Sequence, residues 1–515
     1  MIAIGERQGK DADHRFAETP WDEQTLRWQE IDRELPAEHL ARQIACAVEE
    51  LDLAGLFVTY SGRGTKALRP DLLLKLVLYE TQRGRHSPAQ WFLDAKENSP
   101  AQWLLMGTTP SRATWYEYRV RLAEFWDDWN AQVLRKAMEL GIPVGERVVL
   151  DGTLIAALAS RHRLVNQKTL TSRTEDLERA VARDQQGGTP ENPPGWMAKH
   201  PQTREDQLAR YRRAQSRMDQ LQAENARRTS SKRKKPEKVV VSLSEPEAAL
   251  GRDKLKVFRP LYNLQLMRDL DSAFITAHET FARQNDPGTI GPMLERSVEL
   301  TGKKPGSVFA DAAYAGGPDL AVCEQAGVTL YAPVSENDYS EAKGKKRKLV
   351  QIPKKDFAWL PEEETYRCPE GHRLVPGRTT VRERSNERTV QQTTYRCAAE
   401  HCMACPRAAA CTPAPAKGRS VSRLEHEDLV DQLRARMETP EAKELYKLRR
   451  ETIELRYADL KEHRHLRRFT GYGLSHARAE SAACVLVYNV LLLRATKSSL
   501  AKRPELVEIP EEVPS

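Results

Sequence analysis

Residues 446–469 read YKLRRETIELRYADLKEHRHLRRF. The stretch contains no Pro or Gly and is rich in Leu, Arg, Glu and Lys, which predicts a helix. On a 3.6-residue period, Arg450, Glu454, Tyr457 and Lys461 share one face of that helix. A solvated face with ion pairs at i,i+4 spacing gives the same pattern, so this helix alone does not separate a scaffold from a site.

Two short apolar runs elsewhere in the chain end on an aspartate. They are RVVLDGT at 147–153, which carries Asp151, and SVFADAAY at 307–314, which carries Asp311. Both runs predict buried strands. Carboxylates from two strand ends and from the Glu454 helix are the converging hard oxygen ligands that a divalent-metal site needs. The alternative to a metal ligand, for each aspartate, is a polar residue that only ends a strand.

The totals limit the class of protein. The chain has 515 residues, 40% hydrophobic and 30% charged, which predicts a soluble protein of two to four domains. We expect no membrane span and no signal peptide, and therefore a cytoplasmic, bacterial-type location without a membrane partner. The net charge of +8 is mild for this length, so the position of basic clusters matters more than their sum.

The N-terminal region, 15–140, is predicted to be helical. Pro70 stands at the expected first turn of an apolar helix, and Ser87 and Ser111 are expected caps of two further helices. Short helices with scattered arginines, among them Arg119, are typical of a helical DNA-binding module. A plain helical scaffold explains the pattern equally well.

The central pattern predicts a mixed α/β sheet formed by 145–335 and 426–496. Its elements are expected as strands at 148–156, 256–267, 273–279 and 328–334 and helices at 288–302 and 317–326, with the strand that carries Asp311 between them. A long apolar helix at 477–493 should belong to the core, and the tail at 497–515 is expected to be disordered.

A charged insertion at 160–236 interrupts this pattern. It is predicted to contain a helix at about 203–228 that lacks a broad apolar stripe and projects from the body. A basic run follows the helix and could contact DNA phosphates, although charge runs are commonly only solvated. This run contains Lys232, Arg233, Lys234 and Lys235.

A second insertion, at 336–425, holds five of the eight cysteines. Clustered cysteines in a cytosolic chain favour a metal over disulfides, and the spacing is similar to that of a small zinc ribbon. The preferred ligands of one structural Zn²⁺ are Cys368, Cys402, Cys405 and Cys411, with Cys397 and His372 as alternates. Reduced thiols without a metal are the competing interpretation.

Taken in order, these motifs resemble bacterial insertion-sequence transposases of the DDE type over residues 15–495. The N-terminal segments are similar to the InsH-type transposase domain, and later segments resemble the motifs of the two aspartates, the intervening strands and the glutamate. The matching segments are IDRELPAEH (31–39), YSGRG (60–64), PDLLLKLVLY (70–79), WLLMGTTP (103–110), VLDGTLIAALAS (149–160), LYNLQ (261–265), NDP (285–287), FADAAYAG (309–316) and RRETIELRYADLKE (449–462). A cysteine block at this place also occurs in a subgroup of these enzymes.

The family's glutamate signature is Tyr, two residues, Arg, three residues, Glu, six residues, Lys. Arg450, Glu454 and Lys461 keep this spacing, whereas Lys447 occupies the Tyr position and Tyr446 stands one residue early. The departure affects the Tyr role and leaves the glutamate assignment in place.

The resemblance implies a ribonuclease H-like fold in which Asp151, Asp311 and Glu454 hold two Mg²⁺ or Mn²⁺ ions for DNA strand cleavage and strand transfer. It implies that the N-terminal helices bind the element's terminal inverted repeats. The implied partners are double-stranded DNA and a second copy of the chain in a synaptic homodimer, in a nucleoid-associated location. The residues expected to contact DNA near the site are Arg450, Lys461, Arg464, Arg467 and Arg468. A non-catalytic DNA-binding derivative and a metal-dependent nuclease that does not join strands are the alternatives.

Overall fold

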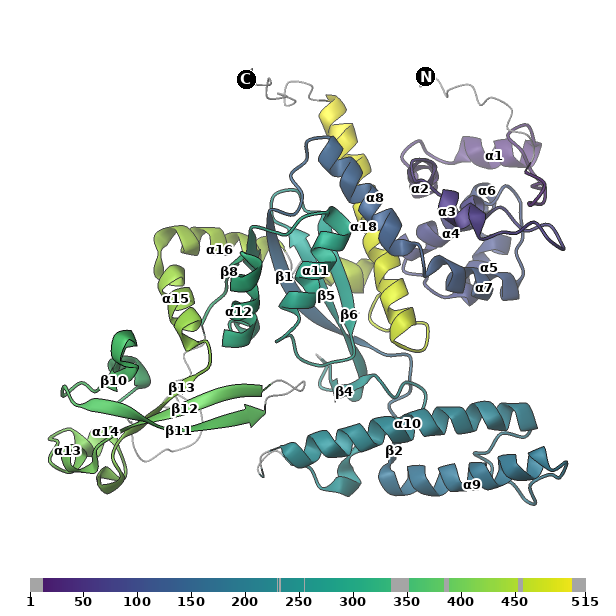
Figure 1. Cartoon of the computed structure of the whole chain (residues 1–515). Coiled ribbons are helices and arrows are strands. Elements are labelled where there is room, and N and C mark those ends of the chain that lie inside the picture. The colour runs from purple at the N-terminus through teal and green to yellow at the C-terminus, as the bar shows by residue number, and fades with distance from the viewer. Residues whose placement is uncertain are drawn as a thin grey trace.

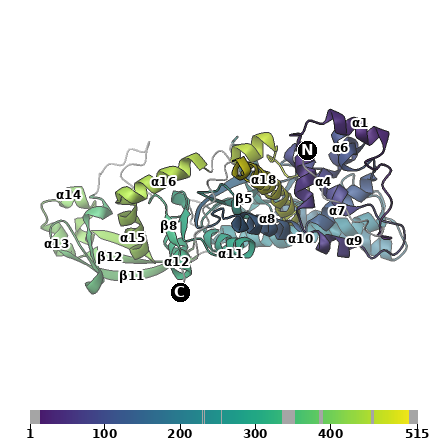
Figure 2. The same cartoon turned by 90° about the horizontal axis from the view of Figure 1, so that it is seen from above.

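The computed structural model describes residues 13–228, 230, 233–253, 255–334, 352–383, 389–452 and 457–502, except the side chains of residues 382, 383 and 450–452. The molecule is elongated: N-terminal helices lie at one end, a cysteine-containing sheet at the other, and the central sheet between them (Figures 1 and 2). A helical hairpin lies below the central sheet in Figure 1.

The N-terminal region is helical, as predicted. Pro70 is the first residue of its helix, and the Ser87 side chain accepts the Gln90 N–H in a capping box, so local sequence signals set both starts. Ser111 caps the next expected helix through the Thr114 N–H. The helices are α1 (Leu26–Glu34), α2 (Leu40–Glu49), α3 (Ala54–Val58), α4 (Pro70–Gln82), α5 (Pro88–Glu97), α6 (Ser99–Leu104), α7 (Arg112–Leu122) and α8 (Trp126–Glu139).

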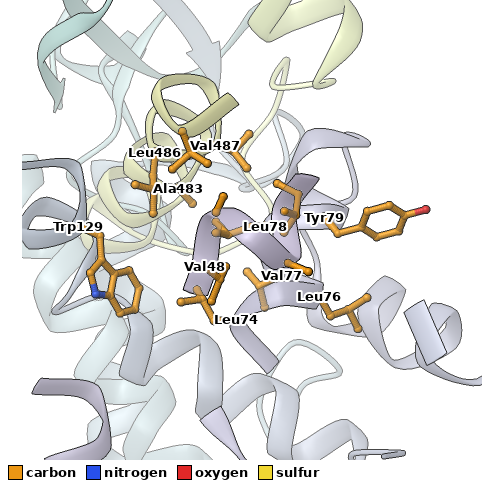
Figure 3. Close-up of a cluster of buried hydrophobic side chains, with 14 of the residues drawn as sticks. Val48, Leu74, Leu76, Val77, Leu78, Tyr79, Trp129, Ala483, Leu486 and Val487 are labelled. Atoms are coloured by element: carbon orange, nitrogen blue, oxygen red, sulfur yellow. The ribbon is translucent and has the colours of Figure 1, made fainter. Parts of the chain in front are cut away.

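The last described helix, α18 (Leu474–Lys502), belongs to two cores. Its Ala483, Leu486 and Val487 pack against α2, α4 and α8 of the N-terminal region (Figure 3). Its Cys484 and Val485 lie in the core beneath the central sheet. Because one rigid helix contributes to both cores, the N-terminal region and the sheet are held together.

The central sheet is mixed and contains six strands. Its order is β6-β5-β1-β7-β8, and β4 also pairs with the first residues of β5. β5 runs antiparallel to β1 and β6, whereas β1, β7 and β8 are mutually parallel. The bounds are β1 (Arg147–Ala156), β4 (Ala249–Arg252), β5 (Phe258–Asp269), β6 (Ile275–Phe281), β7 (Ser307–Phe309) and β8 (Thr329–Tyr331). The predicted hairpin of 256–267 with 273–279 is confirmed as β5–β6.

Alternating residues of β1 face two helical layers, as expected for a buried strand. Val148 and Leu150 pack toward α11 (Ile290–Thr301), α12 (Gly317–Ala326) and α15 (Glu427–Glu438). Val149 and Ile155 pack toward α18 and the segment 457–469. By the same alternation, Asp151 faces the layer that contains 457–469.

The insertion after β1 is a separate helical hairpin. Its base is the antiparallel pair β2 (Leu164–Asn166) and β3 (Val240–Ser242), and its arms are α9 (Gln167–Gln185) and α10 (Pro201–Arg227). Twelve buried apolar residues form its core. The sequence analysis foresaw α10 as a projecting helix but missed α9, whose contact with α10 covers the apolar side of both helices.

The insertion after β8 contains a five-stranded antiparallel sheet in the order β13-β12-β11-β10-β9. The described strands are β9 (Ala358–Leu360), β10 (Thr365–Arg367), β11 (Arg373–Glu383), β12 (Thr389–Cys397) and β13 (Ser420–Leu424). Two short helices, α13 (Ala399–Met403) and α14 (Ala408–Cys411), follow β12 and carry cysteines.

Two expectations about the C-terminal region need correction. The helix predicted across 446–469 ends before 469: α16 spans Pro440–Thr452, residues 453–456 lie outside the described residues, Tyr457 and Ala458 are helical, and a π-helical turn at Asp459–His463 precedes irregular chain. His465 adopts φ 51°, which a helix does not allow. The helix α18 continues to Lys502, past the expected boundary at 497.

By length and composition, α18 is the one helix among the described residues that could cross a membrane. Most of its apolar window is buried against other elements, which is the environment of a core helix.

Candidate active site

Asp151 and Asp311 come from adjacent parallel strands. Val149 pairs with Phe309, so each aspartate lies two residues beyond the same rung of the ladder. Asp311 then caps a short 3₁₀ turn, its Oδ1 accepting the Ala313 N–H at 2.8 Å. The topology therefore brings the two predicted carboxylates to one edge of the site.

Asp151 is largely enclosed, with 21% of its side chain exposed. Burial raises its pKa to about 6, and the negative charges of Asp311 and Asp286 act in the same direction. The Gly152 N–H, at 2.8 Å from Oδ1, and the Arg449 guanidinium, at 3.7 Å from Oδ2, oppose that shift. A carboxylate in this environment gains from any further positive charge.

The chain on both sides of Glu454 is attached to the middle of β1 and to the residue that follows β7. On the α16 side, the Tyr446 hydroxyl donates to the Ala310 carbonyl oxygen at 3.0 Å. On the other side, the Tyr457 hydroxyl donates to the Asp151 carbonyl oxygen. The Lys461 Nζ donates to Thr153 Oγ1 at 2.5 Å and to the Leu154 carbonyl oxygen at 3.2 Å. Glu454 itself lies outside the described residues.

Arg449, and not the expected Arg450, is the described cation beside Asp151. The Arg450 side chain lies outside the described part of the chain, and Lys447 is an exposed partner of Glu444. Tyr446 and Arg449 keep the family's Tyr–two residues–Arg spacing, one residue earlier than the alignment on Arg450 assumed.

A buried polar network lies on the other face of the sheet, beneath Gly152. Asn263 Nδ2 and Gln265 Nε2 both donate to Asp286 Oδ1, at 2.8 and 2.7 Å. The Tyr314 hydroxyl donates to Gln265 Oε1 at 2.5 Å. Because Tyr314 ends the turn that Asp311 begins, the network ties that turn to β5 and the loop after β6.

Gly152 leaves room for this network where it meets the sheet. A Cβ at this position would lie 2.1 Å from Gln265 Nε2 and 2.3 Å from Asp286 Oδ1. The network was not predicted, although three of its members stand in the quoted segments LYNLQ and NDP and the fourth in FADAAYAG. Polar residues inside an apolar strand, such as Asn263 and Gln265, were the signal that could have identified it.

The basic residues after Lys461 differ in accessibility. Arg464 is 3% exposed, donates to the Cys484 carbonyl oxygen at 3.0 Å and pairs with Asp459, so its expected DNA contact is wrong and its role is structural. Arg467 is exposed and pairs with Glu462, and Arg468 is exposed and donates to the Ala157 carbonyl oxygen.

The other predicted DNA contacts lie away from the two aspartates. Arg119 is half-buried on α7, with its guanidinium 5.4 Å from the Tyr116 ring centroid. Arg233, Lys234 and Lys235 are exposed at the end of the hairpin insertion, and Lys232 lies outside the described residues.

The five cysteines of the second insertion line one pocket, together with His372 and His401. Three of them, Cys397, Cys402 and Cys411, are buried, and burial raises the pKa of the Cys397 thiol to about 12. The Arg419 N–H donates to Cys402 Sγ at 3.3 Å. The donor types therefore suit zinc, and the alternate Cys397 lies in the pocket beside the preferred ligands.

Within the described ranges, however, no three His, Cys, Asp or Glu side chains are arranged to hold a metal ion together. The cysteine pocket and the pair Asp151 and Asp311 are among these described residues. Glu454, the third proposed carboxylate, is not.

Comparison with known proteins gives one finding. Residues 367–493, about a quarter of the chain, match the family model described as "Transposase DDE domain". The matched segment contains Glu454 and the cysteine pocket but neither Asp151 nor Asp311. No curated protein matches the chain. The match supports a DDE transposase in general, a class of enzymes that cleaves and transfers DNA.

Proposed function

We propose that the chain is a DNA transposase that binds the terminal inverted repeats of an insertion sequence and catalyses metal-dependent strand cleavage and strand transfer. The observation that carries the proposal is the convergence of Asp151, Asp311 and the two flanks of Glu454 at one end of a mixed sheet. The family match to the segment around Glu454 supports it independently.

The proposal includes a ribonuclease H-like fold for the central sheet. It rests on three antiparallel strands, β6, β5 and β1, followed by two parallel strands, β7 and β8. Helices α11 and α12 connect the strands along one side of this sheet. In this arrangement the carboxylates of β1 and of the turn after β7 lie beside the helical segment 446–463.

Asp151, Asp311 and Glu454 would hold two Mg²⁺ or Mn²⁺ ions. The donor set fits, because hard carboxylate oxygens converge where burial and like charge already favour a cation. When bound, such ions activate water or a DNA 3′-hydroxyl and stabilise the leaving 3′-oxygen during in-line displacement at phosphorus.

The chain's own residues would supply position and charge, which phosphoryl transfer mainly requires. Arg449 stands close enough to Asp151 to neutralise a phosphate brought to the carboxylates. Tyr446 and Tyr457 fix the helical segment against Ala310 and Asp151. The network around Gln265 and Tyr314 holds the turn of Asp311 at a set distance from β1. Lys461, Arg467 and Arg468 would contact the DNA backbone beyond the site.

The first test is cleavage of DNA carrying the ends that flank this gene, in Mg²⁺ or Mn²⁺. We expect wild type to cleave and Glu454→Gln and Asp151→Asn to lose cleavage while they still bind these ends. Equal cleavage by Glu454→Gln would remove that residue from the site. Binding without cleavage by wild type would favour a non-catalytic derivative.

A second assay separates transposition from hydrolysis. Pre-cleaved ends are incubated with supercoiled target DNA, and joined products are counted. Cleavage without joining would identify a metal-dependent nuclease. The proposal also includes a synaptic homodimer, which sedimentation of the protein with two DNA ends would test, and a cytoplasmic, nucleoid-associated location.

A further inference from the structure

The hairpin insertion carries the positive charge of the whole chain. Residues 160–236 contain 18 Lys and Arg against nine Asp and Glu, a net charge of +9. Because the complete chain has a net charge of +8, everything outside the insertion sums to −1. A mild overall charge therefore conceals one strongly basic module, and such modules attract nucleic acid.

The basic side chains of α10 gather on the side opposite α9. At 100° per residue, four arginines fall within an arc of about 100° and extend over about 26 Å of helix. They are Arg210, Arg213, Arg217 and Arg227, and Arg228 follows as the C-cap residue. The residues that α10 buries against α9, among them Tyr211, Ala214 and Met218, are centred on the other side.

Of the nine carboxylates of the insertion, three are paired away from this side, and a fourth, Glu224, pairs with Arg217 on it. Asp184 pairs with Arg204 inside the hairpin, Glu178 with Arg212, and Asp176 with Arg179. Within the described residues no ion pair joins Arg210, Arg213 or Arg227 to a carboxylate. The arginine side of α10 thus keeps charge that an external phosphate could neutralise.

The basic side continues into the chain after α10, close to the end of the central sheet. Arg233, Lys234 and Lys235 are exposed, and the Lys234 Nζ lies 5.9 Å from the ring centroid of Phe258. Phe258 begins β5, the strand on which Leu266 pairs with Asp151. Figure 1 shows β4, which pairs with this end of β5, directly above α10.

The distance from the site to this cluster suits a duplex. Eight residues of β5 separate Leu266 from Phe258, which corresponds to about 27 Å of strand. At 3.4 Å per base pair, the same length spans about eight base pairs of B-DNA. A duplex that leaves Asp151 along β5 therefore reaches Lys234 about eight base pairs from the cut.

We infer that the hairpin insertion is a DNA-backbone clamp, in which the arginine side of α10 and residues 233–235 bind the duplex flanking the cut, starting about eight base pairs from the scissile phosphate. The inference rests on the proposed function for the position of the cut. The inference concerns contacts to phosphates, because Arg and Lys side chains neutralise backbone charge whatever the base sequence.

The test compares Arg233→Gln/Lys234→Gln/Lys235→Gln with a control of equal charge loss on α9, Lys168→Gln/Arg179→Gln/Arg183→Gln. The control residues are exposed on the helix that the proposed path does not touch. Fluorescence anisotropy in Ca²⁺ or EDTA measures Kd for duplexes that carry the gene's flanking ends and stop 4 or 20 base pairs beyond the cut on each side.

On the long duplex we expect the 233–235 variant to raise Kd tenfold or more. The slope of log Kd against log salt concentration should be smaller by about 3 for this variant than for wild type, because three phosphate contacts are lost. The loss should fall below twofold on the short duplex, and the α9 control should stay within twofold on both. Equal losses on short and long DNA, or from both variants, would overturn the clamp.

A failure of the proposed function can be distinguished from a failure of the clamp, because DNA binding is measured under conditions that do not allow cleavage. Wild type that binds ends but never cleaves in Mg²⁺ overturns the proposed function and leaves the clamp to be decided by anisotropy. Active wild type with an unaffected 233–235 variant overturns the clamp alone.

Discussion

The hairpin insertion and the cysteine insertion leave the same sheet, one after β1 and the other after β8, and they differ in how they are stabilised. The hairpin has twelve buried apolar residues and a covered ion pair, Arg204–Asp184, with 2% and 5% of the side chains exposed. Among its described residues, the cysteine insertion has a core of nine buried residues, and three of these are cysteines. The first module needs nothing but its own chain.

The difference shows that a module with a small core needs an additional source of stability. Modules with few buried apolar residues usually rely on a metal or on disulfides, because their burial barely exceeds the entropy lost on folding. The five thiols around one pocket are the obvious place for such a cross-link. The comparison therefore predicts that removing a ligand unfolds one insertion and spares the other.

The largest expected effect is metal removal. Although the described side chains are not arranged around a metal ion, we propose that these thiols bind one Zn²⁺ in the purified protein. A chelator should then unfold the cysteine insertion, since structural zinc contributes about 10 kcal/mol or more in small domains. Metal analysis and hydrogen exchange check this, with loss of protection confined to the cysteine sheet. Cys402→Ser should lose the metal and Cys46→Ser, an exposed cysteine outside the pocket, should keep it. If the cysteine sheet of the metal-free protein kept its full protection against hydrogen exchange, the two insertions would not differ in their need for a metal.

The next effect is in the hairpin. Arg204→Ala leaves Asp184 covered without its partner, which typically costs 3–5 kcal/mol. Because the hairpin is only two helices thick, we expect the lower end, about 3 kcal/mol, seen as faster hydrogen exchange in α9 and α10. Arg212→Ala, which breaks the exposed pair with Glu178, should cost under about 1 kcal/mol. Similar costs for both variants would mean that the hairpin does not depend on its covered pair.

A third change perturbs the sheet between the insertions. Gly152→Ala forces a methyl group against Gln265 and Asp286, and we expect a loss of about 1–3 kcal/mol from overpacking. Thermal unfolding measures it, and exchange in both insertions should be unchanged. Gly195→Ala, in an open hairpin loop with no neighbour within 4 Å, is the control. A neutral Gly152→Ala would show that the polar network can shift.

The smallest effect depends on pH. Burial holds the pKa of Asp151 at about 6, so below that pH the group is protonated and metal binding must displace the proton. We expect the Mg²⁺ concentration for half-maximal cleavage to rise up to tenfold for each pH unit below 6 and to level off above 7. DNA affinity of the hairpin should stay flat over the same range, because Arg and Lys keep their charge. A flat Mg²⁺ requirement would contradict the assignment.

Elements with strong local signals could be predicted from the sequence. The strands that carry or precede Asp151 and Asp311, the β5–β6 hairpin and the helix starts at Pro70 and Ser87 depend on apolar runs, turns and caps that neighbouring residues determine. The strand of Asp151 does not end at this residue but continues to Ala156. The helix α12 was predicted with its observed bounds, Gly317–Ala326.

Features that depend on tertiary contacts could not be predicted. Arg449 lies beside Asp151, and no periodicity argument distinguishes it from the consecutive Arg450. Arg464 is buried because Cys484 and Asp459 surround it, although its sequence neighbours are basic and exposed. Asp286 joins the site region from a loop, where neither period nor spacing marks a residue.

The position of α18 has a consequence during protein synthesis. The N-terminal helices leave the ribosome first, yet their core is completed by Ala483, Leu486 and Val487, which are made more than 300 residues later. At about 5–20 residues per second, the ribosome needs roughly 20–70 s to close that interval. During this time the region expected to hold DNA ends exposes the surface that α18 will cover. Products of interrupted translation would therefore be targets for chaperones and proteases, and only full-length chains would acquire a finished N-terminal region.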